Sequence, residues 1–308
     1  MKVGIRLPQT GEHAKPENVI YLAEAADKSG FDSLWVLERL LWPITPQTKH
    51  PSTPTGNFPQ DWQNVLEPLE LLSFVAAVTE KIYLGTSVID MLFHNPVILA
   101  KRFATLDVIS CGRALAGLGL GWSKDEFLAS NVPFEHRGRR ADEYIGLLKS
   151  IWSDEIIEFN GQFYTIPPSK IGPKPVQKPH LPIYLGGSSP NTFSRMTKYA
   201  NGWIGVVRND LDQLQITLNL LRREVVNANR NPETFETIVI IYPNVSERVT
   251  KEDRRLVFTG TIGEVGSDID RLKKMGVGHI ILNYNRSLIE DDMNAVINMS
   301  KRLLTYAK

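Results

Sequence analysis

The chain has 308 residues, of which 42% are hydrophobic and 22% are charged, and its formal net charge is +1 at pH 7. These ordinary values allow a sizeable core and exclude any general electrostatic attraction to nucleic acid or to a membrane surface. The one cysteine, Cys111, excludes an intrachain disulfide and a cysteine-cluster metal site. We therefore expect a cytoplasmic protein that acts on a small molecule, with no metal, no nucleic-acid partner and no membrane association.

The chain opens with a strand, a helix and a second strand. Residues 2–7 alternate in polarity and end at a proline and glycine turn, as a first strand would. Residues 16–29 begin with proline, carry apolar residues at helical spacing and stop at Gly30. Residues 31–37 then form the second strand, so this part predicts a βαβ unit.

A long proline-rich segment of about residues 39–65 follows the second strand. It is too rich in proline to be a helix and too aromatic to be a simple linker, so we interpret it as a loop insertion. In an α/β barrel this end of the strand is the active-site face. The aromatic residues then either wall a substrate pocket or pin a surface loop, and they are Trp42, His50, Phe58 and Trp62.

The segment from Ile82 to Trp152 organises the chain. The runs IYLGTSVI and RALAGLGLG are separated by a helical pattern over residues 96–110, which predicts two parallel strands joined by a crossover helix. Gly117, Gly119 and Gly121 occupy every second position of the later strand. They indicate either the close approach of a ligand or a barrel strand that needs small residues beside its neighbours.

The rest of the chain continues the alternation. A second insertion, about residues 153–182, contains FNGQFY and fits a hairpin or an extended excursion. The count of eight strands, each followed by a helix, predicts a TIM (β/α)8 barrel with insertions, as one domain over residues 1–308. The remaining expected strands are 183–185, 203–207, 238–242 and 279–283, and the remaining expected helices are 66–79, 142–152, 211–228, 263–275 and 291–306.

The GGSSP sequence that follows the strand at 183–185 is a candidate anion site. Glycines let backbone N–H groups converge, the next helix adds its dipole, and Ser188 and Ser189 can donate hydrogen bonds. A phosphate group would fit there. The alternative is a glycine turn with no ligand.

Several motifs resemble the luciferase-like monooxygenase superfamily, and its coenzyme F420-dependent oxidoreductase subgroup in particular. They are GTSV, NPVILAKRFATLDVIS, GR-x-x-x-G-x-G-x-GW, RG-x-R-x-DEYI, LPIYLGGSS and NGW, in that order, and the similarity covers roughly residues 1–205. The resemblance implies a TIM-barrel oxidoreductase, commonly a homodimer, that binds the deazaflavin coenzyme F420 or FMN.

The resemblance also assigns residues to the cofactor. It implies a non-prolyl cis peptide bond between Ser87 and Val88 behind the cofactor ring. The basic residues before the helix expected near Ala141 would bind anionic groups, with Arg137 as the principal one. The alternative for Arg139 and Arg140 is a solvated basic face in which Arg140 pairs with Asp142 or Glu143. The full set of implied cofactor-binding residues is Leu7, Glu38, Ser87, Val88, Gly119, Gly121, Arg137, Gly186, Gly187 and Ser188.

The catalytic residues are less clear from the resemblance. Many deazaflavin-using members carry Asp-His where this chain has Glu38 and Arg39, and some sugar-phosphate dehydrogenases carry a glutamate where it has Trp122. The candidates are Glu38, Arg39 and Trp42, with no acid or base assigned among them.

The expected activity is hydride transfer between coenzyme F420 and a small organic substrate. The first alternative is an FMN-dependent monooxygenase that uses reduced flavin and O2. The second is a cofactor-binding protein without turnover, because the obvious general acid is missing.

Overall fold

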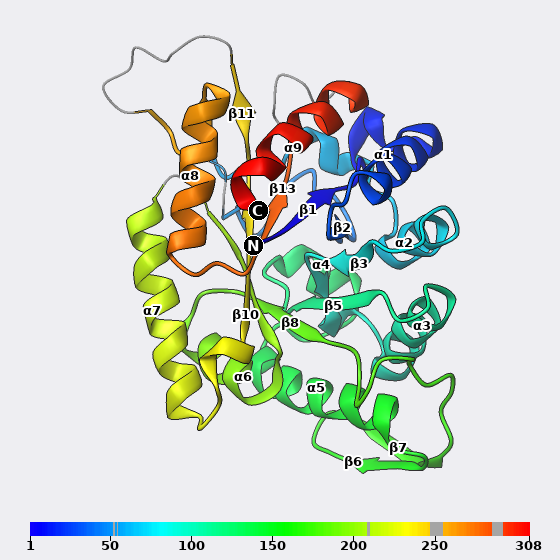
Figure 1. The fold of residues 1–308 in the computed structure, drawn as a ribbon. Coiled ribbons are helices and arrows are strands. Elements are labelled where there is room, and N and C mark those ends of the chain that lie inside the picture. The colour runs from blue at the N-terminus through cyan, green and yellow to red at the C-terminus, as the bar shows by residue number, and fades with distance from the viewer. Residues whose placement is uncertain (52, 54, 208–209, 247–254, 285–291) are drawn as a thin grey trace.

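The protein is an eight-stranded parallel barrel surrounded by helices, described here from a computed structural model over residues 1–51, 53, 55–207, 210–246, 255–284 and 292–308 (Figure 1). Neighbouring strands pair in the order β3-β2-β1-β13-β10-β9-β8-β5, and β5 pairs with β3 to close the barrel. This confirms the predicted TIM barrel. The strands are β1 (Lys2–Arg6), β2 (Ser33–Val36), β3 (Tyr83–Thr86), β5 (Ala114–Gly119), β8 (Ile183–Gly186), β9 (Gly202–Val206), β10 (Glu236–Ile241) and β13 (His279–Leu282).

Long helices cover the outside of the barrel (Figure 1). Several begin where the sequence supplies a proline at the first turn, and one begins with a capping box made by Thr261 and Glu264. They are α1 (Pro16–Lys28), α2 (Pro68–Ala76), α3 (Pro96–Ile109), α5 (Arg137–Ser153), α6 (Pro190–Tyr199), α7 (Leu211–Asn227), α8 (Ile262–Lys274) and α9 (Met293–Ala307).

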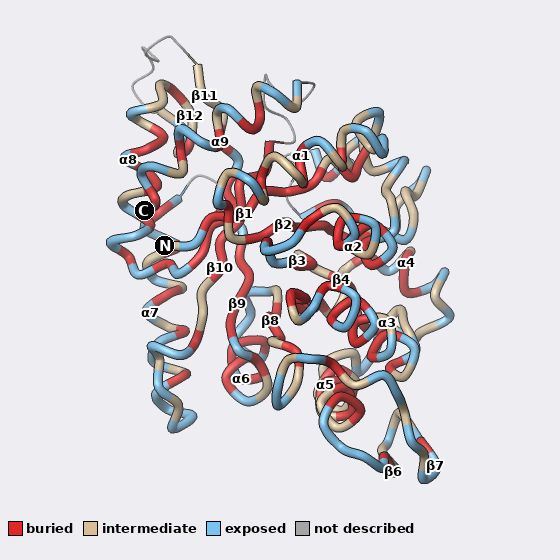
Figure 2. The backbone as a smooth tube through the Cα atoms, turned by 45° about the vertical axis from the view of Figure 1, so that its right-hand side comes forward, coloured by how far each residue is buried: buried red, intermediate tan, exposed pale blue. Residues whose placement is uncertain are grey.

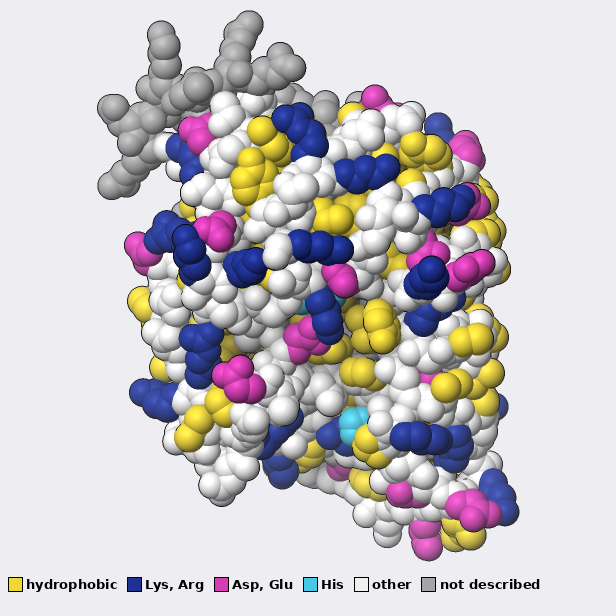
Figure 3. Space-filling view, viewed as in Figure 1, with side chains coloured by type: hydrophobic (Ala, Val, Ile, Leu, Met, Phe, Trp, Pro, Cys, Tyr) yellow, Lys and Arg dark blue, Asp and Glu magenta, His cyan; other side chains and the backbone are white. Residues whose placement is uncertain are grey.

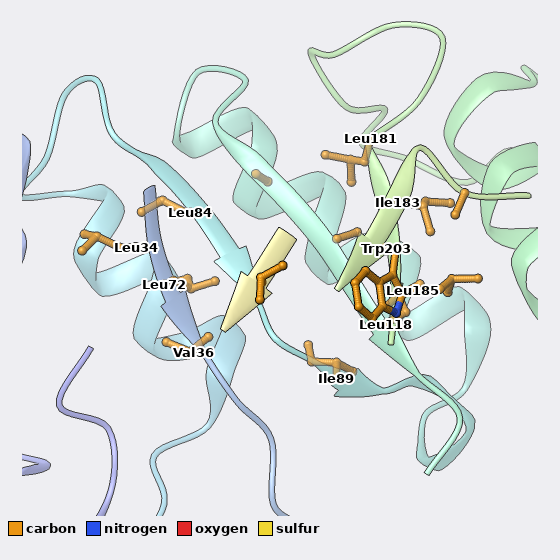
Figure 4. Packing of buried hydrophobic residues seen from close by; sticks show 14 of the residues in the cluster. Leu34, Val36, Leu72, Leu84, Ile89, Leu118, Leu181, Ile183, Leu185 and Trp203 are labelled. Atoms are coloured by element: carbon orange, nitrogen blue, oxygen red, sulfur yellow. The ribbon is translucent and has the colours of Figure 1, made fainter. Parts of the chain in front are cut away.

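Two apolar layers stabilise this arrangement. The larger layer lies between the strands and the helices, and Figure 4 shows part of it, including Leu72 from α2 beside Val36 from β2. Figure 2 shows the strands as the most continuously buried elements, with exposed residues along the outer faces of the helices. The smaller layer fills the barrel itself and consists of Trp35, Leu115, Tyr184, Ile204, Ile238, Ile240 and Ile281.

The insertions add short elements. The second insertion contains the antiparallel hairpin of β6 (Ile157–Asn160) and β7 (Thr165–Ser169), so the hairpin is the one of the two expected forms that is present. The loop after β2 holds one 3-10 turn, η2 (Gln60–Gln63). Further short elements are η1 (Gly11–His13), β4 (Ile89–Asp90), η3 (Met91–Phe93), α4 (Lys124–Ala129), η4 (Pro232–Thr234), β11 (Asn244–Val245) and β12 (Thr259–Gly260).

The expected start of the helix near Ala141 is wrong. Helix α5 begins at Arg137, so the basic residues lie in its first turn and do not precede it. The first turn has no apolar side chain, and His136 occupies the N-cap position in a left-handed conformation with φ of 58° and no side-chain capping bond. Apolar periodicity therefore starts one turn later than the helix itself.

Within the described residues, no helix is long and apolar enough to cross a membrane. On the face of the molecule shown in Figure 3, acidic and basic side chains are interspersed.

Candidate functional site

Two adjoining cavities lie at the carboxyl ends of β3, β5, β8 and β9. Cavity A has a volume of about 830 Å³ and is lined by Val88, Gly119, Gly121 and the first turns of α5 and α6. Cavity B has a volume of about 660 Å³ and is lined by Ser87, Ser188 and residues of β9 and α7. Val88, Gly186 and Gly187 line both cavities, so they form the boundary between them.

The peptide bond between Ser87 and Val88 is cis, which confirms that prediction. The Val88 side chain lies against both glycine segments. A Cβ atom added to Gly119 would lie 2.7 Å from Val88 Cγ2 and 2.5 Å from Asp90 Oδ1, and one added to Gly186 would lie 3.5 Å from Val88 Cγ1. Glycine at 119 therefore leaves room for β4 and Val88 beside the cavity.

The other two glycines of this strand have different neighbours. A Cβ atom on Gly117 would lie 1.8 Å from the Thr86 carbonyl oxygen, so glycine there serves strand packing, the structural alternative raised by the sequence. Gly121 has φ of 76° and packs against Phe93 and Phe127 at a turn.

The loop after β8 is fixed from both sides. Gly187 has φ of 114°, a conformation that favours glycine, and its carbonyl accepts a hydrogen bond from Trp203 Nε1 at 2.8 Å. Ser189 caps α6 by accepting from the Thr192 amide and pairs with Thr192 Oγ1 at 2.7 Å. Ser188 is exposed and lines cavity B, whereas Ser189 is exposed and lines cavity A but has its hydroxyl engaged with Thr192.

Basic side chains surround one part of cavity A. Arg137 and Arg139 come from the first turn of α5, and Arg195 and Lys198 come from α6. Arg195 is held by Asp142 at 2.6 Å and by the Gly138 carbonyl at 3.0 Å. Arg195 and Lys198 were not predicted from the sequence, although their spacing of three residues after a GGSS turn places them on one face of the helix that follows.

Arg140 belongs to a different environment. Its guanidinium donates to the Pro133 carbonyl at 2.9 Å and lies over the Phe163 ring, 5.0 Å from the centroid. The alternative pairing with Asp142 or Glu143 is wrong, because Asp142 binds Arg195 and Glu143 accepts from the amides of residues 162–164.

A buried charged network lies behind cavity A. Arg39 donates to Asp90 at 2.8 Å and to Glu126 at 2.9 Å, and its side chain is 7% exposed. Glu38 accepts from the Asp90 amide at 2.8 Å and contacts His94 Nε2 at 2.7 Å. The Gly121 amide donates to Asp90 Oδ1 at 3.1 Å, so the network connects the ends of β2, β4 and β5.

Burial changes the protonation of this network. Desolvation raises the pKa of Asp90 to about 7, against the opposing effect of Arg39. Desolvation also raises the pKa of Glu126 above its usual range. Asp90 lines cavity A, so a carboxyl group with a raised pKa lies at the site.

The loop after β2 covers this network with aromatic rings. The Arg39 guanidinium lies over Trp62 and Trp122, at 5.3 and 5.2 Å from their centroids. His50 contacts Phe58, Trp62 and Trp122 edge to face. Trp42 is half-buried and donates to the Pro59 carbonyl at 3.1 Å, which pins the loop to itself.

The candidate residues therefore fall into two groups. The lining of cavities A and B includes Ser87, Val88, Gly119, Gly121, Arg137, Gly186, Gly187 and Ser188. The three catalytic candidates, Glu38, Arg39 and Trp42, are not part of either lining, and Leu7 lines a third cavity. Their catalytic roles stay predictions.

The residues fit a planar cofactor with an anionic tail. A planar ring system requires a flat apolar wall. One wall of cavity A consists of the Val88 side chain and the backbone of Gly119 and Gly186. The glycine loop, Ser188 and the basic side chains of cavity A provide donors for phosphate and carboxylate oxygens.

Comparison with known sequences identifies the family. The sequence model described as luciferase-like monooxygenase matches residues 1–279. An uncharacterized protein of Mycobacterium tuberculosis is 36% identical over 194 residues, which cover 62% of this chain and 68% of that protein. An F420-dependent glucose-6-phosphate dehydrogenase of Kineococcus radiotolerans is 28% identical over 241 residues, which cover 76% of this chain and 64% of that enzyme. An FMNH2-dependent dimethylsulfone monooxygenase of Pseudomonas putida is 27% identical over 288 residues, which cover 92% and 72%.

Solved structures share the fold. Monooxygenase RslO1 from Streptomyces bottropensis superimposes with a TM-score of 0.80 and 21% identity over 99% of both chains. An F420-dependent secondary alcohol dehydrogenase in complex with an F420-acetone adduct gives a TM-score of 0.79 and 19% identity over 100% of this chain and 99% of that chain.

Proposed function

Because the chain belongs to the luciferase-like monooxygenase family, we propose that it is an oxidoreductase that binds coenzyme F420 and oxidises or reduces a small organic substrate. The bound deazaflavin would supply hydride transfer. Val88, Gly119 and Gly186 would hold the ring, and Gly187, Ser188 and Arg137 would anchor the anionic tail, since all six residues line the two cavities. The aromatic loop shields the neighbouring charges from water.

The charge of cavity A is the observation that supports F420 over FMN. Four cationic side chains line this cavity, namely Arg137, Arg139, Arg195 and Lys198. Two carboxyl groups also line it, of which Asp142 pairs with Arg195 and Asp90 pairs with Arg39. The cations Arg137, Arg139 and Lys198 therefore have no carboxylate partner in this lining. FMN ends in one phosphate, whereas F420 continues into carboxylates that extra cations can bind.

Titration of both cofactors at low and high salt tests this proposal. We expect F420 to bind more tightly than FMN and to lose more affinity as salt rises, because more ion pairs are screened. Arg137→Ala should weaken F420 binding by about tenfold to a hundredfold, the effect of losing a charged hydrogen bond.

Arg140→Ala is the matched control. Arg140 lies in the same helical turn and carries the same charge, but its guanidinium contacts Pro133 and Phe163. It should leave F420 affinity within about twofold of the wild type. Equal losses in both variants would mean that general charge, and not an anchor in cavity A, controls binding.

The FMN-dependent monooxygenase is the second candidate. The FMNH2-dependent relative covers 92% of this chain, the largest share among the curated relatives described above. Tighter binding of FMN, together with substrate-dependent O2 consumption from reduced flavin, would establish this alternative. Cofactor binding without oxidation above the protein-free rate, for every acceptor tried, would support the non-catalytic alternative.

A further inference from the structure

Arg6 is a buried cation at the carboxyl end of β1, on the same end of the barrel as cavities A and B. Val3 and Ile5 belong to the layer between barrel and helices, and a Cβ on Gly4 would meet Trp35 inside the barrel. Strand alternation therefore directs Arg6 toward the barrel interior, one layer above Gly4. The residue is 8% exposed.

The guanidinium of Arg6 is incompletely paired. Its Nε and Nη2 atoms are shielded from solvent and have no hydrogen-bond partner among the described residues. Burial lowers the pKa of Arg6, only partly offset by Tyr242 and Asp61. Buried polar groups in folded proteins nearly always have a partner, so these two nitrogens need an explanation.

Arg113 shows what a purely structural arginine looks like in this protein. It is buried to the same extent, at 8% exposed. Its three guanidinium nitrogens donate to the carbonyls of Ala76, Thr79, Ile82 and Ser110 and to the Thr79 hydroxyl. The contrast indicates that the fold satisfies the hydrogen bonds of Arg113 but not those of Arg6 Nε and Nη2.

Arg6 lines a third cavity of about 740 Å³, cavity C. Other lining residues are Leu7, Thr10, Gln60, Asn64 and Tyr284, a mixture of apolar surface and uncharged polar groups. Asp61 also lines it and accepts a hydrogen bond from Thr10 Oγ1 at 2.9 Å. Cavity C therefore has room for a small organic molecule at the mouth of the barrel.

We propose that Arg6 anchors a carboxylate group of the substrate, which enters through cavity C. Nε and Nη2 form the side-on edge of a guanidinium, whose two parallel N–H groups match the two oxygens of a carboxylate. Both nitrogens are shielded from solvent in this structure, so binding includes a rotation of the Arg6 side chain that exposes them to the ligand. Asp61 and Glu12 in the same lining favour a ligand with one anionic group over a polyanion.

Calling the bound carboxylate a substrate rests on the proposed function, but the test of the binding site does not use the cofactor. Cofactor-free protein is titrated with butyrate and benzoate, and with butyramide and benzamide as neutral analogues of the same shape, at constant ionic strength. We expect both carboxylates to bind and to raise Tm by about 2 °C near saturation, while the amides leave Tm unchanged.

Three variants locate the binding. Arg6→Gln should weaken carboxylate binding by about tenfold to a hundredfold, and Arg6→Lys by at least about tenfold, since lysine keeps the charge but lacks the side-on edge. Arg137→Ala, which removes a cation from cavity A, should leave carboxylate binding unchanged.

A fourth variant tests the cost of the unpaired charge. Without ligand, Arg6→Met should melt at a higher temperature than the wild type, because a buried charge without a partner is removed.

Two results would overturn the proposal. One is that wild-type protein shows no preference for carboxylates over amides, a comparison that needs no variant to fold. The other is that Arg6→Gln or Arg6→Lys binds the carboxylates as well as the wild type does. Wild-type protein that binds the carboxylates but does not bind F420 would contradict the proposed function and would still support the carboxylate site.

Discussion

Arg39 illustrates how one residue at the end of a barrel strand determines the surroundings of the site. It is buried between two carboxylates, Asp90 and Glu126, and two indole rings. Through Asp90 it holds β4, and therefore Val88, against the glycines of β5. Its role in this structure is to position the wall of cavity A.

Replacing Arg39 should destabilise the protein strongly. Arg39→Met leaves Asp90 and Glu126 buried without their cation, and breaking a buried ion pair in this way costs about 3 to 5 kcal/mol of unfolding free energy. Urea unfolding at pH 8 measures the loss. The triple variant Arg39→Met, Asp90→Asn, Glu126→Gln should recover much of it, since it removes the unpaired charges as well.

Arg102→Met is the control for this prediction. Arg102 pairs with Glu70 on the surface, where the side chains are 26% and 63% exposed. Such pairs contribute at most about 1 kcal/mol. A loss for Arg39→Met no larger than that for Arg102→Met would show that the network does not hold the fold together.

At the scale of elements, the site depends on how closely β4 approaches β5. Ile89 and Asp90 pair with Leu118 and Gly119, and the glycine has no side chain to separate the two segments. The first turn of α5 and the later turns of α6 then contribute their basic residues to the lining of the same cavity.

Gly119→Ala should therefore weaken cofactor binding more than it weakens folding. The new methyl group would lie 2.5 Å from Asp90 Oδ1 and 2.7 Å from Val88 Cγ2, so these two side chains, which both line cavity A, must shift. We expect at least about a tenfold loss of cofactor affinity, measured by titration, for a shift that costs about 1 to 3 kcal/mol.

Gly146→Ala is the matched control within α5, because a Cβ there has no atom within 4 Å. It should stabilise the protein by about 0.4 to 1 kcal/mol and leave cofactor affinity unchanged. Cofactor binding by Gly119→Ala equal to that of Gly146→Ala would show that β4 and β5 do not form the cofactor wall.

The sequence predicted elements better than contacts. The barrel and the hairpin at Ile157–Ser169 follow from local periodicity and turn residues, which each segment carries by itself. The start of α5 was missed because its first turn is polar and is capped by a left-handed His136. The partners of Arg39 and the unpaired edge of Arg6 depend on residues far apart in the chain, and no local pattern contains them.

The whole molecule has two chemically different ends. The cavities lie at the carboxyl ends of the strands, whereas the amino-terminal end is closed by a polar group around His279, which contacts Ser33 Oγ at 2.8 Å and lies 3.8 Å from Glu236. A serine, a histidine and a glutamate are also the residue types of a nucleophilic triad. Ser33 cannot act as a nucleophile here, because it has no exposed surface and accepts a hydrogen bond from Trp35 Nε1. This end serves stability, as is usual for the barrel.

The last prediction concerns the pH dependence of that stability. Burial lowers the pKa of His279 to about 4, from 6.5 for an exposed histidine. Between these values the unfolded chain binds more protons than the native protein, so the contribution of His279 is complete above pH 6.5 and falls as pH decreases toward 4, by about 3 kcal/mol in total. Asp90 has the opposite sign, because its pKa of about 7 lies above the unfolded value, and its contribution is lost as pH rises through 7. Both the wild type and His279→Gln contain Asp90, so subtracting the unfolding free energy of the variant from that of the wild type removes the Asp90 effect and leaves that of His279. We expect this difference to decrease by about 3 kcal/mol from pH 7 to pH 4, and a difference that stays constant over that range would contradict a neutral buried His279.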